Sequence, residues 1–328
     1  MRLAVIGTGR IVKEALDAMR PVAAIECTAI FGRPHSRDKA EAIAASFAIP
    51  SVYTDYDALL AASDIDFVYI GLVNSAHYAY AKKALLAGKH VILEKPFCST
   101  LAEAQEIVRL AQEKGLYLFE AVTLFHQPNY ELVRKSLPSL GRIRLVQSNY
   151  SQYSSRYDAY LEQKVAPAFD PALSGGCLFD INIYNLNFVI GLFGAPKDIQ
   201  YAANLGFNGI DTSGIVQLRY EDFQAVCIGA KDSECRSFVI IQGENGSIYV
   251  PGPPSIVSAV ELNVMGEKQT LQKNMYEHRM TAEFQAFARM YDGQELAAMQ
   301  QGMQRSLQVM AAAEKARHSA GIAFAADI

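Results

Sequence analysis

The chain has 328 residues, of which 51% are hydrophobic and 20% are charged, a balance typical of a globular protein long enough for two domains. This composition excludes long disordered segments. The 30 basic and 34 acidic residues are well mixed and give a net charge of -4, so we expect no nucleic-acid partner.

We also expect no secretory signal and no membrane span. The strand-like run Met1–Gly7 is not preceded by a charged segment and a cleavage site, and no apolar stretch approaches the roughly 20 residues that a bilayer requires. The 5 cysteines are scattered and lack a C-x-x-C pair, so neither a disulfide framework nor a metal site is expected. A reducing cytoplasm fits this pattern best.

Strands alternate with helices in the first part of the chain. Strands are predicted at residues 3–6, 26–31, 67–70, 90–93 and 116–120. Helices are predicted between them, at residues 10–19, 38–47, 75–87 and 101–114. This alternation predicts an α/β domain over residues 1–122, a Rossmann fold with an open, doubly wound, mostly parallel sheet.

After residue 122 the pattern changes. Strands are predicted at residues 140–153, 198–205, 212–220, 225–230, 237–242 and 247–250. After a long insertion with a helix at 177–193, they follow one another without intervening helices, which indicates an antiparallel sheet. Two helices are predicted within 277–316. We therefore expect an α+β domain over residues 123–328 that contains a large, mainly antiparallel open sheet.

A glycine turn, Gly7-Thr8-Gly9-Arg10-Ile11, joins the first strand to the first helix. The first glycine permits a tight turn, and the second lets the backbone approach a pyrophosphate at the helix N-terminus. Val12 replaces the third glycine of the dinucleotide fingerprint, so we expect the helix and the strand to pack slightly further apart there. A purely structural turn is the alternative, but the position after the first strand favours cofactor binding.

Gly32-Arg33 follows the second strand, where NAD-binding domains usually place a carboxylate for the ribose hydroxyls. No acid is present, and Arg33 with Ser36 and Arg37 can form the bidentate contacts that a 2′-phosphate favours. We therefore predict NADP(H) as the cofactor, with NAD(H) as the alternative. These residues can also be solvated loop residues.

Glu94-Lys95-Pro96 follows the fourth strand, at the edge where doubly wound sheets bind ligands. The proline keeps Lys95 out of a helix, in an extended or turn geometry. A lysine there can polarise or protonate the oxygen of a reacting carbonyl. The alternative is a surface lysine before a turn.

Two runs, Tyr69–His77 and Ala87–Phe97, resemble the glucose-fructose oxidoreductase, inositol dehydrogenase and rhizopine-catabolism family, Gfo/Idh/MocA. The similarity extends over essentially the whole chain, including Gly175–Asp180, Asp211–Ser213 and Gly243–Gly246. It implies a Rossmann domain and an α+β domain, with the active site between them. It also implies that the open sheet mediates formation of a homodimer or homotetramer.

The resemblance also implies roles for individual residues. Lys95 matches the family's catalytic, substrate-orienting lysine, and Val73 replaces a proline common before the asparagine of the first run. Residues expected in the cofactor pocket, with Glu120 near the nicotinamide, are Leu72, Asn74, His77, Glu94, Lys95 and Glu120.

Asp180 and Tyr184 are four residues apart in the helix after Gly175-Gly176 and hence share one face. Many sugar dehydrogenases of the family have a histidine at the second position, whereas tyrosine resembles the dimeric dihydrodiol dehydrogenase-like branch. A phenol, with an ordinary pKa of about 10, donates a proton at neutral pH. We predict Tyr184 as the general acid/base, Lys95 as the group that holds and tunes it, and Asp180 as a ligand of a substrate hydroxyl or of the lysine. A core tyrosine and a helix-dipole aspartate are the alternatives.

Several polar residues leave two interpretations open. His126 can be a ligand or a structural histidine. Phe125 stands where the related branch often has an arginine, which makes an anionic or heavily hydroxylated substrate less assured. The asparagines can meet sugar hydroxyls or bridge backbone groups, and the tyrosines can line a sugar cleft or pack: Asn182, Asn185, Asn187, Tyr150, Tyr153, Tyr157 and Tyr160.

These patterns together predict an NADP(H)-dependent oxidoreductase that moves a hydride between nicotinamide and a hydroxyl or carbonyl carbon. The expected substrate is a sugar, a cyclitol or a diol-like compound. The alternatives are a hydrolase or lyase that uses tightly held NAD transiently, and a cofactor-sensing regulator without turnover.

Overall fold

The structure is a computed structural model that describes residues 1–327. Its contacts divide the chain into two compact units. The first unit comprises Met1–Ala121 and Tyr276–Ser306, and the second comprises Val122–Met275 and the residues from Leu307 onward. The sequence analysis assigned both C-terminal helices to the second domain. In the structure α9 (Thr281–Asp292) belongs to the first unit, and α10 (Leu296–Ser319) contributes to both.

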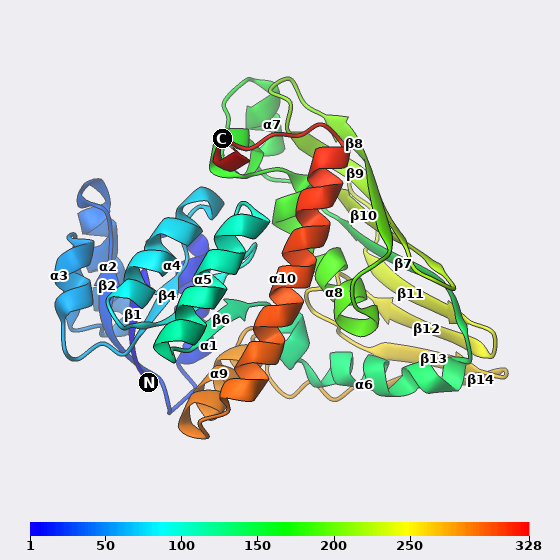
Figure 1. The fold of residues 1–328 in the computed structure, drawn as a ribbon, viewed down its shortest axis with the longest axis horizontal. Helices are drawn as coiled ribbons and strands as arrows, with labels where there is room; N and C mark the ends of the chain where they lie inside the picture. The colour runs from blue at the N-terminus through cyan, green and yellow to red at the C-terminus, as the bar shows by residue number, and fades with distance from the viewer. Residues whose placement is uncertain (328) are drawn as a thin grey trace. The chain divides into compact units, whose positions relative to one another are not determined.

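The first unit is built on a six-stranded parallel sheet with the order β3-β2-β1-β4-β5-β6 (Figure 1). Its strands are β1 (Arg2–Ile6), β2 (Glu26–Phe31), β3 (Ser51–Tyr53), β4 (Phe67–Ile70), β5 (His90–Glu94) and β6 (Leu118–Ala121). Its helices before α9 are α1 (Arg10–Met19), α2 (Arg37–Phe47), α3 (Tyr56–Ala61), α4 (His77–Leu86) and α5 (Leu101–Lys114). The predicted doubly wound α/β fold is confirmed.

β3 and α3 were not predicted from the sequence. The strand has only three residues, all half-buried at the sheet edge, so it lacks the continuous apolar run of the central strands. In β1 and β4, by contrast, every residue from Leu3 to Ile6 and from Phe67 to Ile70 is fully buried, as expected for strands covered on both faces.

Helix α9 returns to this sheet and completes its core. Phe287 stacks on Phe119 of β6 with ring centres 4.5 Å apart, and Phe284 meets Tyr69 of β4 edge-on at 5.8 Å. Because these rings are buried, the fold of the first unit depends on a segment more than 150 residues distant in sequence from its last strand.

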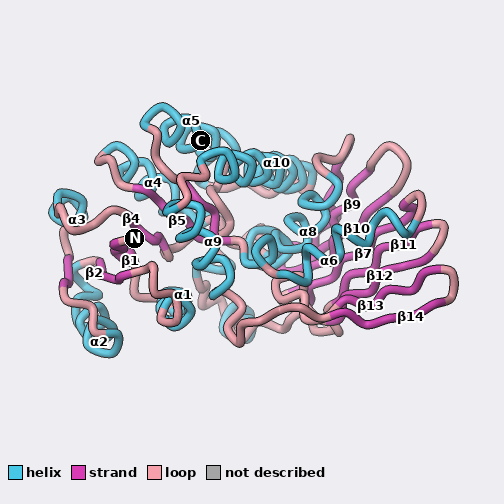
Figure 2. Tube along the Cα trace, turned by 90° about the horizontal axis from the view of Figure 1, so that it is seen from below, coloured by secondary structure: helices cyan, strands magenta, loops and turns pink. Residues whose placement is uncertain are grey.

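The second unit contains an eight-stranded sheet with the order β14-β13-β12-β11-β7-β10-β9-β8 (Figure 2). Its strands are β7 (Ile143–Ser151), β8 (Asp198–Leu205), β9 (Asp211–Arg219), β10 (Gln224–Ala230), β11 (Phe238–Gly243), β12 (Gly246–Pro251), β13 (Val260–Val264) and β14 (Glu267–Leu271). Only β7 and β10 pair in parallel, so the predicted mainly antiparallel sheet is confirmed. The sequence analysis missed β13 and β14, whose polar residues form the exposed end of the sheet.

One face of this sheet is covered by α8 (Ile183–Phe193), which is buried along most of its length. Residues Pro171–Phe193, which include it, are long and apolar enough to cross a membrane, contrary to our expectation that no stretch approaches that length. Within them, however, 72% of the apolar window is buried inside the protein, as in the core helix of a globular domain.

The remaining helices of the second unit are α6 (Pro128–Ser136) and α7 (Tyr157–Leu161).

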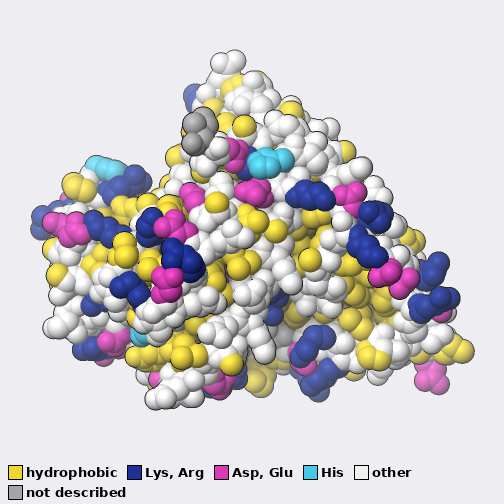
Figure 3. All heavy atoms as spheres, viewed as in Figure 1, with side chains coloured by type: hydrophobic (Ala, Val, Ile, Leu, Met, Phe, Trp, Pro, Cys, Tyr) yellow, Lys and Arg dark blue, Asp and Glu magenta, His cyan; other side chains and the backbone are white. Residues whose placement is uncertain are grey.

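On the face shown in Figure 3, basic and acidic side chains are interspersed, and neither sign forms a continuous patch. Among residues 1–327, no three His, Cys, Asp or Glu side chains gather in a group that could hold a metal ion.

Candidate functional site

The glycine turn of the first unit has a geometry that excludes larger residues. Gly7 has a φ of +122°, and a Cβ added there would lie 2.6 Å from the carbonyl oxygen of Gly71. Gly9 is the N-cap of α1, no described atom lies within 4 Å of its added Cβ, and no side chain caps the helix. The first-turn N–H groups of α1 therefore remain available for an anion such as a pyrophosphate.

A second glycine explains why Val12 is accepted in this turn. Val12 is fully buried, and a Cβ added to Gly71 would lie 2.9 Å from its Cγ2 atom. The missing glycine of the fingerprint is thus matched by a glycine at the end of β4, because the valine side chain occupies the space that a side chain at position 71 would need. Sequence reasoning quoted Gly71 only as part of the family resemblance.

The end of β2 lies next to this turn. A Cβ on Gly32 would be 3.3 Å from Thr8 Cγ2 and 3.0 Å from Ala40 Cβ, so a glycine allows the loop to approach closely. Arg33 is exposed and precedes a short 3-10 turn. Arg37 is also exposed, but its Nε donates to Glu41 Oε1 at 2.8 Å. A phosphate at this edge would compete with a carboxylate for Arg37.

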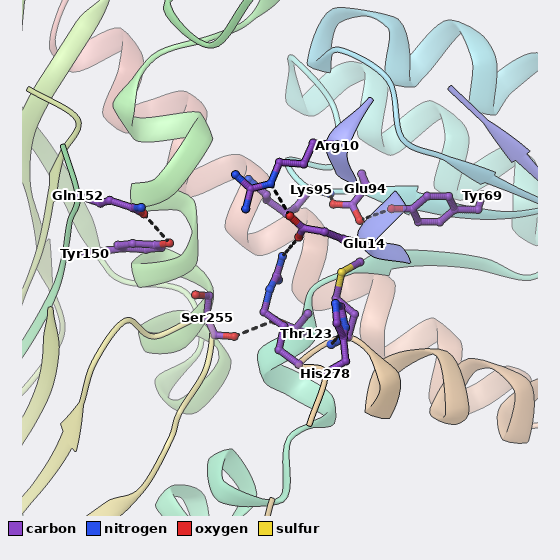
Figure 4. A network of polar contacts seen from close by, with 12 residues as sticks. Arg10, Glu14, Tyr69, Glu94, Lys95, Thr123, Tyr150, Gln152, Ser255 and His278 are labelled. Atoms are coloured by element: carbon purple, nitrogen blue, oxygen red, sulfur yellow. Dashed lines mark hydrogen bonds and ion pairs between the residues drawn. The ribbon is translucent and has the colours of Figure 1, made fainter. Parts of the chain in front are cut away.

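Arg10 has a similar carboxylate partner, because its Nε donates to Glu14 Oε1 at 2.7 Å (Figure 4). Its side chain is nevertheless 89% exposed at the N-terminus of α1. The Arg10 guanidinium is therefore exposed to solvent beside this helix terminus.

The loops after β4 and β5 are connected by His77, which is fully buried. Its Nδ1 lies 2.9 Å from the carbonyl oxygen of Pro96, and its Nε2 lies 3.2 Å from that of Leu72. Burial lowers the pKa of His77 to about 4, so the ring is neutral at pH 7. His77 therefore braces the two loops that carry the candidate cofactor residues Leu72 and Lys95.

Lys95 and Asn74 are half-buried at these strand ends, with Lys95 preceding a cis peptide bond to Pro96. The carboxyl group of Glu94 contacts the Tyr69 hydroxyl and the backbone N–H of Lys95. The Tyr69 hydroxyl donates to Glu94 Oε1 at 2.7 Å (Figure 4), and the Lys95 N–H donates to Oε2 at 3.3 Å.

Three carboxyl groups, Glu94, Glu120 and Glu283, are buried in the first unit. Burial raises the pKa of Glu94, and it raises that of Glu120 to about 7. The pKa of Glu283 on α9 is raised well above the usual range by burial and by the charge of Glu94, and neither of its oxygens has a described hydrogen-bond partner. Burial therefore favours the protonated form of these three carboxyl groups relative to exposed ones.

In the second unit, the position of the Asp211 side chain explains why the motif Gly175-Gly176 has a glycine at position 176. Gly176 has a φ of +99°, and a Cβ added there would lie 2.1 Å from Asp211 Oδ1. Asp211 Oδ2 accepts hydrogen bonds from the Leu178 N–H at 2.6 Å and from the Tyr201 hydroxyl at 2.7 Å. The carboxylate thus fixes the first residue of a π-helical turn, Leu178–Asn182, which continues into α8.

The predicted pair Asp180 and Tyr184 lies on this segment. Asp180 belongs to the π turn, and Tyr184 belongs to the first turn of α8, where its side chain is 8% exposed. Such turns within helices are frequent at functional sites. Asp180 Oδ2 lies 2.7 Å from the Nζ of Lys231, a residue that sequence reasoning missed.

Tyr150 of β7 is the sequence-predicted tyrosine that lies beside this pair. Its ring centre is 6.0 Å from that of Tyr184, and its hydroxyl donates to Gln152 at 3.4 Å (Figure 4). The other three belong to a separate aromatic cluster, in which Tyr157 contacts both Tyr153 and Tyr160. Of the two interpretations, packing fits those three.

The buried asparagines hold the helical segment against the sheet. Asn182 Nδ2 donates to the Cys227 carbonyl, and Asn185 Nδ2 donates to that of Ile228, both on β10. Asn187 donates to the Ile183 carbonyl within the helix. The bridging interpretation therefore describes these amides. His126 is half-buried in the 3-10 turn Thr123–His126, and the neighbouring ring of Phe125 packs against Tyr130 at 5.6 Å.

Each unit thus gathers its own predicted residues. The first brings the glycine turn, the β2 end and the β4 and β5 loops to the carboxyl edge of one parallel sheet, where such folds bind ligands. The second brings Tyr184 next to Tyr150, with Asp180 on the preceding π turn. Lys231 had no sequence signal beyond its position directly after a strand, since a single lysine there is ordinarily a surface residue.

Models of known protein families match residues in each of the two units. Residues 1–122 match the model of an oxidoreductase family with an NAD-binding Rossmann fold, GFO_IDH_MocA, and residues 138–249 match the GFO/IDH/MocA C-terminal domain.

Similar proteins include the oxidoreductase YgjR of Escherichia coli, with 34% identity over 89% of this chain and 88% of the relative. The scyllo-inositol 2-dehydrogenase (NADP(+)) IolU of Bacillus subtilis is 32% identical over 100% of this chain and 99% of the relative. A trans-1,2-dihydrobenzene-1,2-diol dehydrogenase of Danio rerio is 28% identical over 76% and 74% of the two chains.

Among solved structures, the 3-ketoreductase KijD10 of Actinomadura kijaniata, in complex with NADP and TDP-benzene, has the same fold. It matches with a TM-score of 0.83 and 22% identity, over 97% of each chain. The two family models, together with relatives that are more than 30% identical over most of the chain, show that this protein belongs to the Gfo/Idh/MocA family of oxidoreductases.

Proposed function

We propose that the protein is an NADP(H)-dependent oxidoreductase that interconverts a hydroxyl and a carbonyl group on a sugar, a cyclitol or a diol-like compound. The observation that carries this proposal is the glycine turn, where the uncapped N-terminus of α1 and the close approach of Gly7 to Gly71 leave room for a dinucleotide. The names of two relatives, a scyllo-inositol dehydrogenase and a dihydrodiol dehydrogenase, support the substrate class.

A bound nicotinamide would supply or accept the hydride. We assign the proton to Tyr184, which gives it to the substrate oxygen during reduction and takes it back during oxidation. The Lys95 ammonium lowers the cost of the phenolate, and Asp180 accepts a hydrogen bond from a substrate hydroxyl. The cofactor-binding residues in this proposal are Gly7, Thr8, Gly9, Arg10, Ile11, Gly32, Arg33, Arg37, Leu72, Asn74, His77, Glu94, Lys95 and Glu120.

The variant Tyr184→Phe tests the proton transfer. It retains the ring beside Tyr150 and loses only the hydroxyl, so we expect kcat to fall by about 100-fold or more while the Kd for NADPH is unchanged. Oxidation of scyllo-inositol and of trans-1,2-dihydrobenzene-1,2-diol with NADP⁺ is followed by absorbance. Tyr153→Phe, which alters a tyrosine bonded to Asp158, is the matched control. Equal turnover of Tyr184→Phe and the parent would remove Tyr184 from the mechanism.

The preference for NADP(H) rests on Arg33, which is exposed at the end of β2 and has no described ion-pair partner, unlike Arg37. We expect Arg33→Ala to raise the Kd for NADPH by about tenfold or more, because a hydrogen bond to a charged group contributes about 1.5–3 kcal/mol. The Kd for NADH should change little. Fluorescence titration measures both constants, with Arg109→Ala on α5 as the control for loss of a charge. Equal weakening of the two cofactors would contradict the assignment.

The state of Glu120 gives a pH-dependent prediction. Its pKa is about 7 in the folded protein against 4.5 ordinarily, so the folded chain binds this proton more tightly than the unfolded chain. The bound proton makes its full contribution to the free energy of unfolding below pH 4.5, and this contribution is lost as the pH rises to about 7. Glu120→Gln cannot ionise. Its free energy of unfolding relative to the parent should therefore rise by on the order of 2–3 kcal/mol between about pH 5 and pH 8.

Urea denaturation at the two pH values measures this difference, since contributions from other titrating groups cancel between variant and parent. Glu113→Gln changes a carboxylate with a 53% exposed side chain and should show no comparable pH dependence. A difference between Glu120→Gln and the parent that is the same at both pH values would show that Glu120 titrates normally.

We also propose that the open face of the eight-stranded sheet binds a second copy of the chain. Side chains that alternate with the buried ones form rows of mixed apolar and amide groups across this face. Ile215 of β9, 48% exposed, lies directly opposite Ile228 of β10. Val226 lies between Gln217 of β9 and Gln147 of β7, and Gln147 is opposite Ile240 of β11. Exposed apolar groups on an open sheet face favour association, and most homo-oligomers form about a two-fold axis.

The variant Ile228→Glu tests this interface. A carboxylate buried in an apolar contact is unfavourable, so sedimentation should show a shift from dimer or tetramer to monomer, with circular dichroism unchanged. Leu161→Glu, which alters a 61% exposed leucine outside the sheet, should keep the parent's oligomeric state. A monomeric parent, or an unchanged oligomer of Ile228→Glu, would contradict the proposed interface.

A further inference from the structure

Lys231 is the most deeply buried lysine of the second unit, with a side chain that is 3% exposed. It follows β10 directly, and its N–H donates to the Thr212 carbonyl on the neighbouring strand. Its Nζ donates to the Ala168 carbonyl at 2.6 Å and lies 2.7 Å from Asp180 Oδ2. The ammonium also stands over the ring of Phe169, 4.1 Å from its centre.

One of the groups that Lys231 contacts, the Asp180 carboxylate, belongs to the proposed site. The Ala168 carbonyl and the Phe169 ring belong to the insertion before α8, and Asp180 belongs to the π turn that precedes Tyr184 by one helical turn. A buried cation beneath the turn therefore holds one carboxylate oxygen, while the side chain of Asp180 as a whole remains 36% exposed. The cation lies inside the protein and the carboxylate reaches its surface.

Stability alone is a weak reason for this arrangement. Removing an ammonium from water costs several kcal/mol, and buried ion pairs are often replaced by apolar side chains without loss of stability. The ring of Phe169 already provides an apolar surface against the side chain of Lys231. Because one partner of the pair belongs to the proposed catalytic set, an effect on the position of that partner is the better explanation.

We propose that Lys231 is a positioning residue, which fixes the Asp180 carboxylate in the orientation that the substrate requires. It acts through Asp180 and touches neither substrate nor cofactor. The proposal rests on the proposed function, because it gives Asp180 a role toward the substrate. Two further carboxylates nearby have other partners: Asp211 accepts from Leu178 and Tyr201, and Asp232 accepts from the hydroxyls of Thr212 and Ser213.

A double-mutant cycle tests whether Lys231 acts through Asp180. Lys231→Met, Asp180→Asn and the double variant are compared with the parent in oxidation of scyllo-inositol and trans-1,2-dihydrobenzene-1,2-diol by NADP⁺. We expect Lys231→Met to lower kcat by on the order of 10- to 100-fold, as small displacements of catalytic groups do, with an unchanged Kd for NADPH. In the Asp180→Asn background the same change should alter kcat by no more than about twofold.

Circular dichroism and thermal melting establish that each variant is folded. If Lys231→Met does not fold, Lys231→Gln replaces it in the cycle, because its amide can still donate to the Ala168 carbonyl without carrying a charge. Lys197→Met, which removes an exposed lysine paired with Glu221, is the matched control and should keep the parent's kcat.

The outcomes separate this inference from the proposed function. A parent without activity on either compound would overturn both. An active parent with an unchanged kcat in Lys231→Met, or with equal losses in the presence and absence of the Asp180 carboxylate, would overturn only the role of Lys231. A loss confined to KM would also contradict it, because a misplaced carboxylate in the reacting complex must lower kcat.

Discussion

The hydrogen bond from the Leu178 N–H to the carboxylate of Asp211 determines where the helical segment that carries Asp180 and Tyr184 begins. It forms only because Gly176, with a positive φ, has no side chain in the space of that carboxylate. From this point the π turn and α8 place Asp180 and Tyr184, and the buried amides hold the segment to β10. The motif around residues 175–180 is therefore a packing constraint between a strand end and a helix start, and the proposed chemistry depends on it.

A comparable constraint operates in the first unit. A Cβ on Gly7 would clash with the carbonyl oxygen of Gly71, and a Cβ on Gly71 would clash with the Val12 side chain, which occupies the space at position 71. The dinucleotide turn is thus a joint property of the β1 and β4 ends. By the sequence fingerprint of the first turn alone, Val12 is a mismatch, because a glycine is expected there. In the structure, Gly71 at the end of β4 leaves space for the Val12 side chain.

Much of this arrangement could be predicted from local patterns. Buried parallel strands, the glycine turn and the segment with Asp180 and Tyr184 each have a signal within a few residues, so the fold was predicted correctly and candidate residues could be proposed. Long-range packing had no such signal. Neither the return of α9 to the first sheet nor the burial of Lys231 beneath Asp180 follows from neighbouring residues, because each depends on segments far apart in the chain. The asparagines of α8 remained ambiguous for the same reason, since their partners lie on β10.

Buried carboxyl groups occur in both units, and their partners bear on the proposed chemistry. In the first unit, burial raises the pKa values of Glu94, Glu120 and Glu283. In the second, burial likewise raises the pKa of Asp211, which accepts two hydrogen bonds, whereas the half-exposed Asp180 is paired with the Lys231 ammonium. A proton-transfer group needs neighbours whose charge does not change when it reacts. The ion pair with Lys231 holds the charge of Asp180, one helical turn before Tyr184, and so satisfies that requirement.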